Sequence, residues 1–405
     1  MVQKAYLVAL QQGHQRDWEV DDNLMELAEL AADAGLEVVD TFKQKRFTPD
    51  AGTFIGKGKA LELGAVIEPD AVVIFDDELT PAQQGNLSDL MDAPVIDRTQ
   101  LILDIFAQRA HTNEGKIQVE LAQLNYLLPR LTGKGTLLSR LGGGIGTRGP
   151  GETKLETDRR RIRKRIADLN NELEKVRRVR AVQRAGRERN EVPLVALVGY
   201  TNSGKSTLMT ALTGSETYAA DQLFATLDPT VRRWDVGDGR WVYLSDTVGF
   251  IRKLPHTLVA AFRATLEEVT YADLLLHVID VSHPQAREQA DAVHEVLKEI
   301  GAVQPVICVY NKIDLLPHRM ETKAPDTAVS AKTGENLAQL TEAVYDFFAA
   351  QNSVRSYFFT FHQLSEANQL RERARIIAEE FTAEGVKITA EVEPIMASIM
   401  SPFEN

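Results

Sequence analysis

The segment from Gly199 to Ser206 reads Gly-Tyr-Thr-Asn-Ser-Gly-Lys-Ser, which matches the GxxxxGKS pattern of a phosphate-binding loop. It follows the apolar run Leu194–Val198, which predicts a buried strand, and it opens a stretch that predicts a helix. In such a strand-to-helix turn the backbone N–H groups and the helix N-terminus face an anion. We expect Lys205 to span the β- and γ-phosphates of a nucleotide and Ser206 to bind Mg²⁺. A glycine-rich turn without a ligand is the alternative, which the flanking strand and helix disfavour.

Two later segments have the pattern of nucleotide-sensing switches. In Asp246-Thr-Val-Gly249, the carboxylate of Asp246 can hold Mg²⁺ through water and the Gly249 N–H can sense a γ-phosphate. The stretch Phe224–Thr230 carries two threonines, Thr226 and Thr230. Either hydroxyl could be the second one on Mg²⁺, so the physics of the loop leaves both open.

Two further motifs indicate which base is bound. Asn311-Lys-Ile-Asp314 follows a predicted strand, and the Asp314 carboxylate can accept from N1–H and the 2-amino group of guanine. Adenine lacks both donors, so it would leave the buried carboxylate unpaired. Asn311 and Lys312 would brace the base and the phosphate loop, and the N–H of Ala331 in Ser330-Ala-Lys332 could meet guanine O6. The four motifs in this order predict a domain, at roughly residues 190–350, that binds and hydrolyses GTP.

The residue after Gly249 is Phe250. In Ras-like GTPases this position is a glutamine that orients the attacking water, and a phenyl ring cannot hydrogen-bond water. We therefore expect slow intrinsic turnover that increases when a partner docks.

Apolar periodicity divides the 405 residues into four predicted domains. These are an N-terminal α/β domain (1–112), a long antiparallel helical hairpin (113–190), a doubly wound P-loop domain with a parallel sheet (191–350) and a small C-terminal α+β domain (351–405). In the last domain we expect a strand at Tyr357–Phe361, a charged helix at Leu364–Phe381 and a strand at Val386–Val392. No role is assigned to this domain.

Charge is distributed unevenly along the chain. The net charge is −12, but residues 130–190 contain 18 Lys and Arg against 7 Asp and Glu, which makes this segment +11 and the remainder −23. The segment joins a glycine-rich loop, Pro129–Gly151, to an arginine-studded helix, Arg159–Arg189. Such a hairpin could follow an RNA phosphate backbone. The alternative is a solvated helix whose charges pair with residues such as Glu172 and Glu174.

The N-terminal half carries several unusual strings that are not explained by the phosphate loop. They are Phe54-Ile-Gly-Lys-Gly-Lys59, Phe75-Asp-Asp-Glu-Leu-Thr80, Asp97-Arg-Thr-Gln100, Gln118-Val-Glu-Leu-Ala-Gln-Leu124 and Gly142-Gly-Gly-Ile-Gly-Thr-Arg-Gly-Pro-Gly-Glu-Thr-Lys154. Over residues 5–350 the chain resembles the HflX family of translational GTPases, whose members carry a hydrophobic residue where Phe250 stands. Lys57 and Lys59 could equally form a second phosphate contact or a turn into a helix.

The resemblance implies a partner and a set of site residues. Family members bind the large (50S) ribosomal subunit and split or rescue stalled ribosomes, particularly under heat stress. Ser206 and Thr226 would bind Mg²⁺, and Lys205, Thr226 and Gly249 would act in catalysis. Nucleotide contacts would come from Gly199, Tyr200, Thr201, Asn202, Ser203, Gly204, Lys205, Ser206, Phe224, Ala225, Thr226, Leu227, Asp228, Asp246, Thr247, Val248, Gly249, Asn311, Lys312, Ile313, Asp314, Ser330, Ala331 and Lys332.

Two other functions fit parts of the sequence. A signalling GTPase that recruits a protein effector has no need of a +11 hairpin, and an RNA-remodelling ATPase conflicts with Asp314. No apolar run approaches the roughly 18 residues of a membrane span, and Met1–Leu10 lacks a signal-peptide layout. We therefore expect a cytoplasmic monomer that binds ribosomal RNA through residues 130–190.

Overall fold

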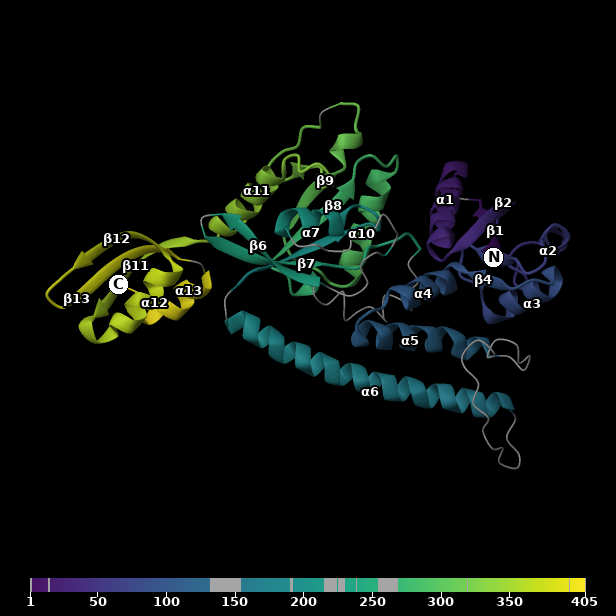
Figure 1. The fold of residues 1–405 in the computed structure, drawn as a ribbon, viewed down its shortest axis with the longest axis horizontal. Helices are drawn as coiled ribbons and strands as arrows, with labels where there is room; N and C mark the ends of the chain where they lie inside the picture. The colour runs from purple at the N-terminus through teal and green to yellow at the C-terminus, as the bar shows by residue number, and fades with distance from the viewer. Residues whose placement is uncertain are drawn as a thin grey trace.

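The computed structural model describes residues 2–13, 15–131, 154–189, 192–214, 224, 230–237, 239–253, 269–318, 320–392 and 394–404. Most of the predicted glycine-rich loop, and the predicted contacts Ala225, Thr226, Leu227 and Asp228, lie outside these residues. Three sheet-containing units follow one another along the long axis of the molecule, and one long helix runs beside the first two (Figure 1). Within the described ranges, no helix is both long and apolar enough to cross a membrane.

The N-terminal unit is a four-stranded parallel sheet with helices on both faces. Its elements are β1 (Gln3–Gln12), α1 (Asp17–Asp33), β2 (Leu36–Arg46), α2 (Lys57–Gly64), β3 (Val72–Phe75), α3 (Pro81–Met91), β4 (Val95–Asp97) and α4 (Arg98–Arg109), with the strand order β2-β1-β3-β4. Side chains alternate across β1, so Leu7 enters the core under α1 and α4, while Val8 enters the core under α2 and α3. Local signals begin two of the helices, since Thr80 caps α3 ahead of Pro81, and Asp97 caps α4.

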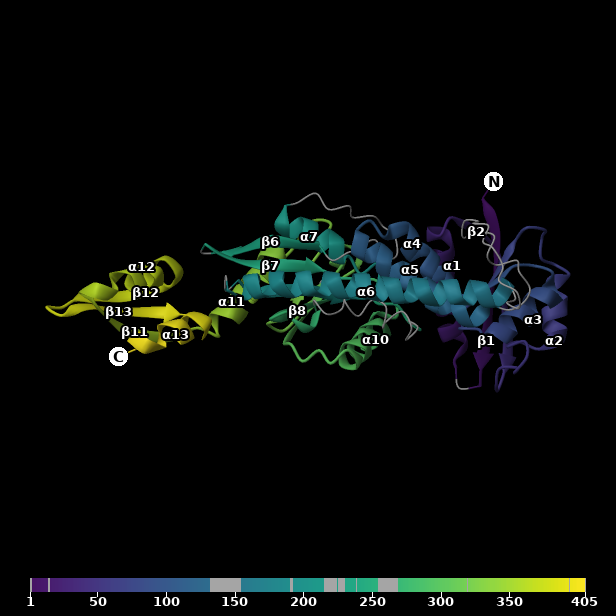
Figure 2. The same ribbon diagram turned by 90° about the horizontal axis from the view of Figure 1, so that it is seen from below.

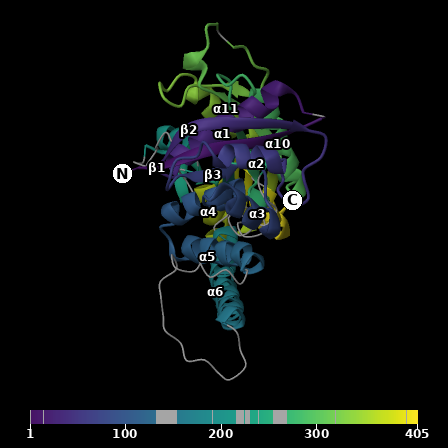
Figure 3. The same ribbon diagram turned by 90° about the vertical axis from the view of Figure 1, so that its right-hand side faces the viewer.

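A helical hairpin follows the N-terminal sheet. It consists of α5 (Asn113–Leu127), a 3₁₀ turn (Leu128–Arg130) and α6 (Lys154–Arg189), and it lies on the side of the unit away from β2 (Figures 2 and 3). The two helices run antiparallel, because Arg159 at the start of α6 donates to the Leu131 carbonyl at 2.8 Å, and Arg165 pairs with Glu120 at 2.7 Å. Their contact is an apolar seam of Ile117, Leu121, Leu124, Leu128, Leu155, Ile162, Ile166, Leu169 and Leu173.

A buried arginine fixes the end of the first hairpin arm to the N-terminal sheet. Arg130 stacks on the Tyr126 ring at 3.5 Å and donates to the Leu79 carbonyl at 2.6 Å. Asp97 accepts from Arg130 at 3.3 Å and from the Tyr126 hydroxyl at 2.8 Å. The residues that enter the loop are therefore held firmly to the N-terminal sheet.

The central unit is a six-stranded sheet with helices on both faces. Its elements are β5 (Leu194–Gly199), α7 (Lys205–Thr213), β6 (Thr230–Gly237), β7 (Arg240–Asp246), β8 (Leu274–Asp280), α10 (Ala286–Glu299), β9 (Val306–Asn311), a 3₁₀ turn (Ile313–Leu315), β10 (Thr327–Ala328) and α11 (Leu337–Ala349). The strand order is β10-β9-β8-β5-β7-β6, and β6 pairs antiparallel with β7. The predicted α/β class is thus confirmed, with one antiparallel edge strand that the sequence reading did not include.

The C-terminal unit is a three-stranded antiparallel sheet, β11-β13-β12. Its elements are β11 (Ser353–Thr360), a 3₁₀ turn (Phe361–Gln363), α12 (Leu364–Arg373), β12 (Arg375–Phe381), β13 (Gly385–Val392), α13 (Pro394–Met400) and a 3₁₀ turn (Ser401–Phe403). The prediction of one helix over Leu364–Phe381 is wrong in its second half. Residues from Arg375 onward pair with β13 instead, because the hydrogen bonds of strand pairing outweigh local helix propensity there.

Candidate active site

The phosphate-binding loop joins the buried end of β5 to the start of α7. Its two framing glycines lie where a side chain cannot fit. A Cβ on Gly199 would be 2.3 Å from the Val278 carbonyl oxygen, and one on Gly204, whose φ is +94°, would be 2.3 Å from Asn311 Nδ2. The loop therefore wraps closely enough for its N–H groups to converge on a phosphate.

Lys205 is enclosed by the loop that precedes it. Its Nζ donates to the carbonyl oxygens of Gly199 at 3.1 Å and Tyr200 at 2.8 Å. Burial lowers the pKa of Lys205 to about 8, and the nearby Asp246 carboxylate opposes this shift. The side chain thus places a positive charge where the sequence predicts the β- and γ-phosphates.

The predicted Mg²⁺ ligands come together from two neighbouring strands. Because β5 and β7 pair in parallel, Ser206 at the start of α7 lies beside Asp246 at the end of β7, and its hydroxyl donates to Asp246 Oδ2 at 2.8 Å. A hydroxyl and a carboxylate side by side are the hard oxygen donors that Mg²⁺ prefers. The donor set fits the ion, although Thr226 lies outside the described residues.

The predicted base-binding residues converge at the ends of β9 and β10. Asn311 holds two loops together, since its Nδ2 donates to the Ser203 carbonyl at 2.8 Å and its Oδ1 accepts from the Ala331 N–H at 3.0 Å. Ser330 donates to Asp314 at 2.7 Å, which orients the carboxylate. Lys312 pairs with Asp280 at 2.7 Å, an orienting partner that the sequence reading did not identify.

The segment after Asp246 is joined directly to the phosphate loop. The N–H of Phe250 donates to the Gly199 carbonyl at 3.1 Å, and the N–H of Thr201 donates to the Phe250 carbonyl at 2.6 Å. Gly249 lies so close that a Cβ there would be 2.8 Å from Thr201 Cα and 3.0 Å from Lys205 Nζ. Only glycine fits this position beside the predicted phosphate site.

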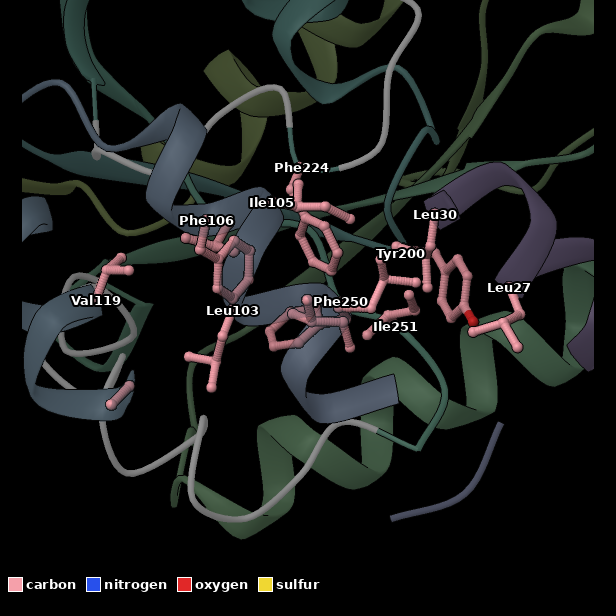
Figure 4. Close-up of a cluster of buried hydrophobic side chains, with 14 of the residues drawn as sticks. Leu27, Leu30, Leu103, Ile105, Phe106, Val119, Tyr200, Phe224, Phe250 and Ile251 are labelled. Carbon is pink, nitrogen blue, oxygen red and sulfur yellow. The ribbon is translucent and has the colours of Figure 1, made fainter. Parts of the chain in front are cut away.

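The side chain of Phe250 is part of the interdomain core. It is 2% exposed and belongs to a cluster that includes Leu27 and Leu30 of α1 and Leu103 and Phe106 of α4 (Figure 4). Phe224 joins this cluster from the other switch, with its ring 4.6 Å from that of Phe106. Residues of both predicted switches therefore pack against the N-terminal unit.

A set of ion pairs surrounds this apolar contact. Arg98 is 1% exposed and bridges Glu26 of α1 and Asp76 at the end of β3. Glu26 also accepts from the Tyr200 hydroxyl, so the bridge extends to the phosphate loop. Burial lowers the pKa of Arg98 to about 10, which leaves it charged at neutral pH.

The second switch contributes its own cations to the same set of ion pairs. Arg252 pairs with Asp22, and its N–H donates to the Tyr200 hydroxyl at 2.7 Å. Lys253 pairs with Asp76 and with Asp77. Sequence reasoning missed these contacts. The sequence did contain a signal for these contacts. Asp76 and Arg98 are charged residues at the ends of predicted apolar strands, in the strings Phe75–Thr80 and Asp97–Gln100.

Comparison with known proteins shows which family has this arrangement. Family models match three parts of the chain, namely a GTP-binding GTPase N-terminal region (21–107), a GTP-binding GTPase middle region (109–187) and a 50S ribosome-binding GTPase domain (194–312). The GTPase HflX of Caldanaerobacter subterraneus is 52% identical over 92% of this chain and 88% of its own length. The GTPase HflX of Escherichia coli is 49% identical over 84% of this chain and 83% of its own length.

The chain belongs to the HflX family of GTPases. The resemblance found from the sequence is thereby confirmed, and the protein is a GTP-hydrolysing enzyme. Among solved structures, a GTP-binding protein of the archaeon Sulfolobus solfataricus in complex with GDP is 26% identical over 85% of this chain and 98% of its own, with a TM-score of 0.45.

Proposed function

We propose that this HflX-family GTPase binds the large ribosomal subunit through its hairpin and uses the GTP cycle to split or rescue stalled ribosomes under stress, heat included. The observation that carries the proposal is the exposed charge of α6. Arg161, Arg163, Lys164, Lys175 and Arg177 are exposed, and none of them forms an ion pair within the described residues. The helical period places Lys164 and Lys175 opposite the apolar seam with α5 and Arg161 at its flank.

This arrangement argues against the alternative that the basic residues of α6 are all paired with acidic side chains. Two arginines do pair with acids, since Arg165 contacts Glu120 at 2.7 Å and Arg178 contacts Glu174 at 3.5 Å. The five cations that have no ion-pair partner among the described residues remain available for phosphates. Neutralising phosphates with Lys and Arg releases counterions, so binding should weaken steeply with salt.

Within the nucleotide site we propose that Lys205 and the loop N–H groups bind the phosphates, that Asp314 and Ala331 select guanine, and that Ser206 holds Mg²⁺. The family resemblance adds Thr226 as the second hydroxyl on the ion. Mg²⁺ held there would supply positive charge that neutralises the phosphates. The remaining predicted contacts complete the pocket. They are Tyr200, Thr201, Asn202, Ser203, Phe224, Ala225, Leu227, Asp228, Thr247, Val248, Lys312, Ile313, Ser330 and Lys332.

Phe250 explains why the enzyme should be slow without a partner. Its ring is buried among apolar side chains and presents no group that could orient water. A docked ribosomal subunit would provide or position the missing group. A ribosomal partner also agrees with the expected cytoplasmic location and with a monomeric chain.

The proposal is tested by measuring GTP hydrolysis with and without purified large subunits, together with co-sedimentation over a salt series. We expect strong stimulation and salt-sensitive binding for the unaltered chain. Arg161→Ala, Lys164→Ala and Lys175→Ala together should remove binding and leave basal hydrolysis unchanged. A control triple variant, Arg287→Ala, Lys298→Ala and Lys323→Ala, removes the same charge from exposed positions of the central unit. Equal binding by both triple variants would contradict the role of α6, and the absence of any stimulation would favour a signalling switch.

A further inference from the structure

A cleft of about 440 Å³ opens between the N-terminal and central units, outside the nucleotide site. One wall is α1, the opposite wall is α10, and the floor includes residues 251–253 that follow Gly249. Its volume falls within the range of small-molecule sites. Neither the phosphate-loop motifs nor the proposed RNA contacts involve it.

The cleft is lined by carboxylates. Glu288, Glu295 and Glu299 lie on one face of α10, and Glu19 faces them from α1. Glu288 and Glu295 are exposed and have no ion-pair partner within the part of the chain that is described. A concave wall with charges of one sign concentrates ions of the opposite sign.

The two cations in the wall do not cancel this charge. Arg252 pairs with Asp22, which does not line the cleft. Lys253 pairs with Asp76 and Asp77, which also lie outside it. Glu288 and Glu295, which have no ion-pair partner among the described residues, therefore give the α10 wall of the cleft a negative charge.

Two further side chains in the cleft are suited to contact an organic ligand. Asn23 lines the cleft and is 7% exposed, yet its amide has no hydrogen-bond partner among the described residues. The amide atoms of Asn23 are not among the fully buried atoms without a partner, so they remain accessible from the cleft and can form hydrogen bonds with a ligand. Trp18 is 38% exposed at the same wall, and its ring can stack against an ammonium group.

The spacing of the acids indicates the class of cation. Across the described residues, no group of three or more His, Cys, Asp and Glu side chains converges closely enough to hold a metal ion. The glutamates are instead spread along α10 at positions 288, 295 and 299. Several separated carboxylates suit several separated ammonium groups, each of which can form a charge-assisted hydrogen bond.

We propose that this cleft binds a linear aliphatic polyamine, which spans from the glutamates of α10 to Trp18 and Asn23 of α1. The bound cation joins the N-terminal helix to the central unit across residues 251–253. This site requires neither GTP nor a ribosome, so it stands apart from the proposed ribosomal function.

The test is calorimetric titration of the full chain with spermidine at physiological ionic strength, with MgCl₂ as the competing cation. We expect saturable binding to one site, unaffected by Mg²⁺ at equal ionic strength. Glu288→Gln with Glu295→Gln should weaken binding by about tenfold or more, and Asn23→Ala should weaken it less. Glu342→Gln with Glu384→Gln removes the same charge from distant exposed positions and should leave binding unchanged.

Tryptophan emission supplies a second measurement. Spermidine should change the fluorescence of the unaltered chain, and Trp18→Phe should abolish that change while saturable heat remains. The proposal is overturned if no saturable heat appears, if Mg²⁺ displaces spermidine, or if the distant double variant loses as much affinity as the cleft variant.

Discussion

The N-terminal and C-terminal units are attached to the central unit in different ways. One continuous core runs from α1 and α4 into the phosphate loop and both switches, with a buried arginine bridge beside it. The C-terminal unit has a separate core of its own and follows α11 directly. The side-chain ion pair that reaches it from the central unit, Arg240 with Glu391, spans 4.0 Å. A change at the nucleotide site can therefore reach the N-terminal unit through packed atoms, whereas the described residues show no comparable shared core with the C-terminal unit.

The largest expected effect concerns the phosphate loop, against which the N-terminal unit packs. Lys205→Ala removes the buried ammonium at the predicted phosphate site, so we expect nucleotide binding to be lost and hydrolysis to fall by more than about a hundredfold. Binding of a fluorescent GTP analogue measures the first effect and phosphate release the second. Lys323→Ala, an exposed lysine of the same unit, is the matched control. Retained binding in the Lys205 variant would place the phosphates elsewhere.

Changing the base-selecting carboxylate should have the next largest effect. Asp314→Asn turns one acceptor of guanine hydrogen bonds into a donor, so GTP affinity should fall by about a hundredfold or more, while affinity for xanthosine triphosphate should rise. Competition between the two nucleotides for a fluorescent analogue measures both changes. If the preference for GTP persists, guanine is not read by Asp314.

The third prediction compares the two attachments directly through one arginine from each unit. Arg98→Met leaves Glu26 and Asp76 without their shared partner, so the loss of stability should be about 3 kcal/mol or more. Arg371→Met removes a partly exposed pair with Glu379 in the C-terminal unit and should cost about 1 kcal/mol or less. Denaturant unfolding of both variants measures the difference. Equal losses would contradict the comparison.

The smallest effect concerns pH. His277 of β8 is 1% exposed, and its pKa is lowered to about 3, first by burial and then by the neighbouring His294 and Lys205. Because an unfolded histidine titrates near pH 6.5, the folded state loses stability as pH falls from about 6.5 towards 3, by up to about 1.4 kcal/mol per pH unit.

His277→Leu should remove that part of the acid sensitivity, which thermal melting between pH 4 and pH 7 would detect. His362→Leu, at an exposed position in the C-terminal unit, should leave the pH profile unchanged. Parallel profiles for the His277 variant and the unaltered chain would show that His277 is not the group responsible.

Much of the site could be read from the sequence because each motif is local. Gly199–Ser206, Asp246–Gly249 and Asn311–Asp314 follow strands whose apolar runs are recognisable, and parallel strands bring their carboxyl ends to one edge. The helix prediction over Leu364–Phe381 failed in its second half because local sequence does not determine the structure there. Its exposed half has weak periodicity, and only pairing with β13 made it a strand.

The phosphate loop could thus be predicted from local sequence alone, because a strand, a glycine-rich turn and a helix are neighbours along the chain. The contact between that loop and the N-terminal unit could be recognised only in the folded molecule. Tyr200 meets Glu26 across 174 positions of sequence, and Lys253 meets Asp76 across 177. No local pattern encodes such pairs, since they arise only when two separately formed sheets bury their faces against each other. The sequence by itself predicted a GTPase site, and the tertiary structure decided that the N-terminal unit packs against its phosphate loop and switch residues.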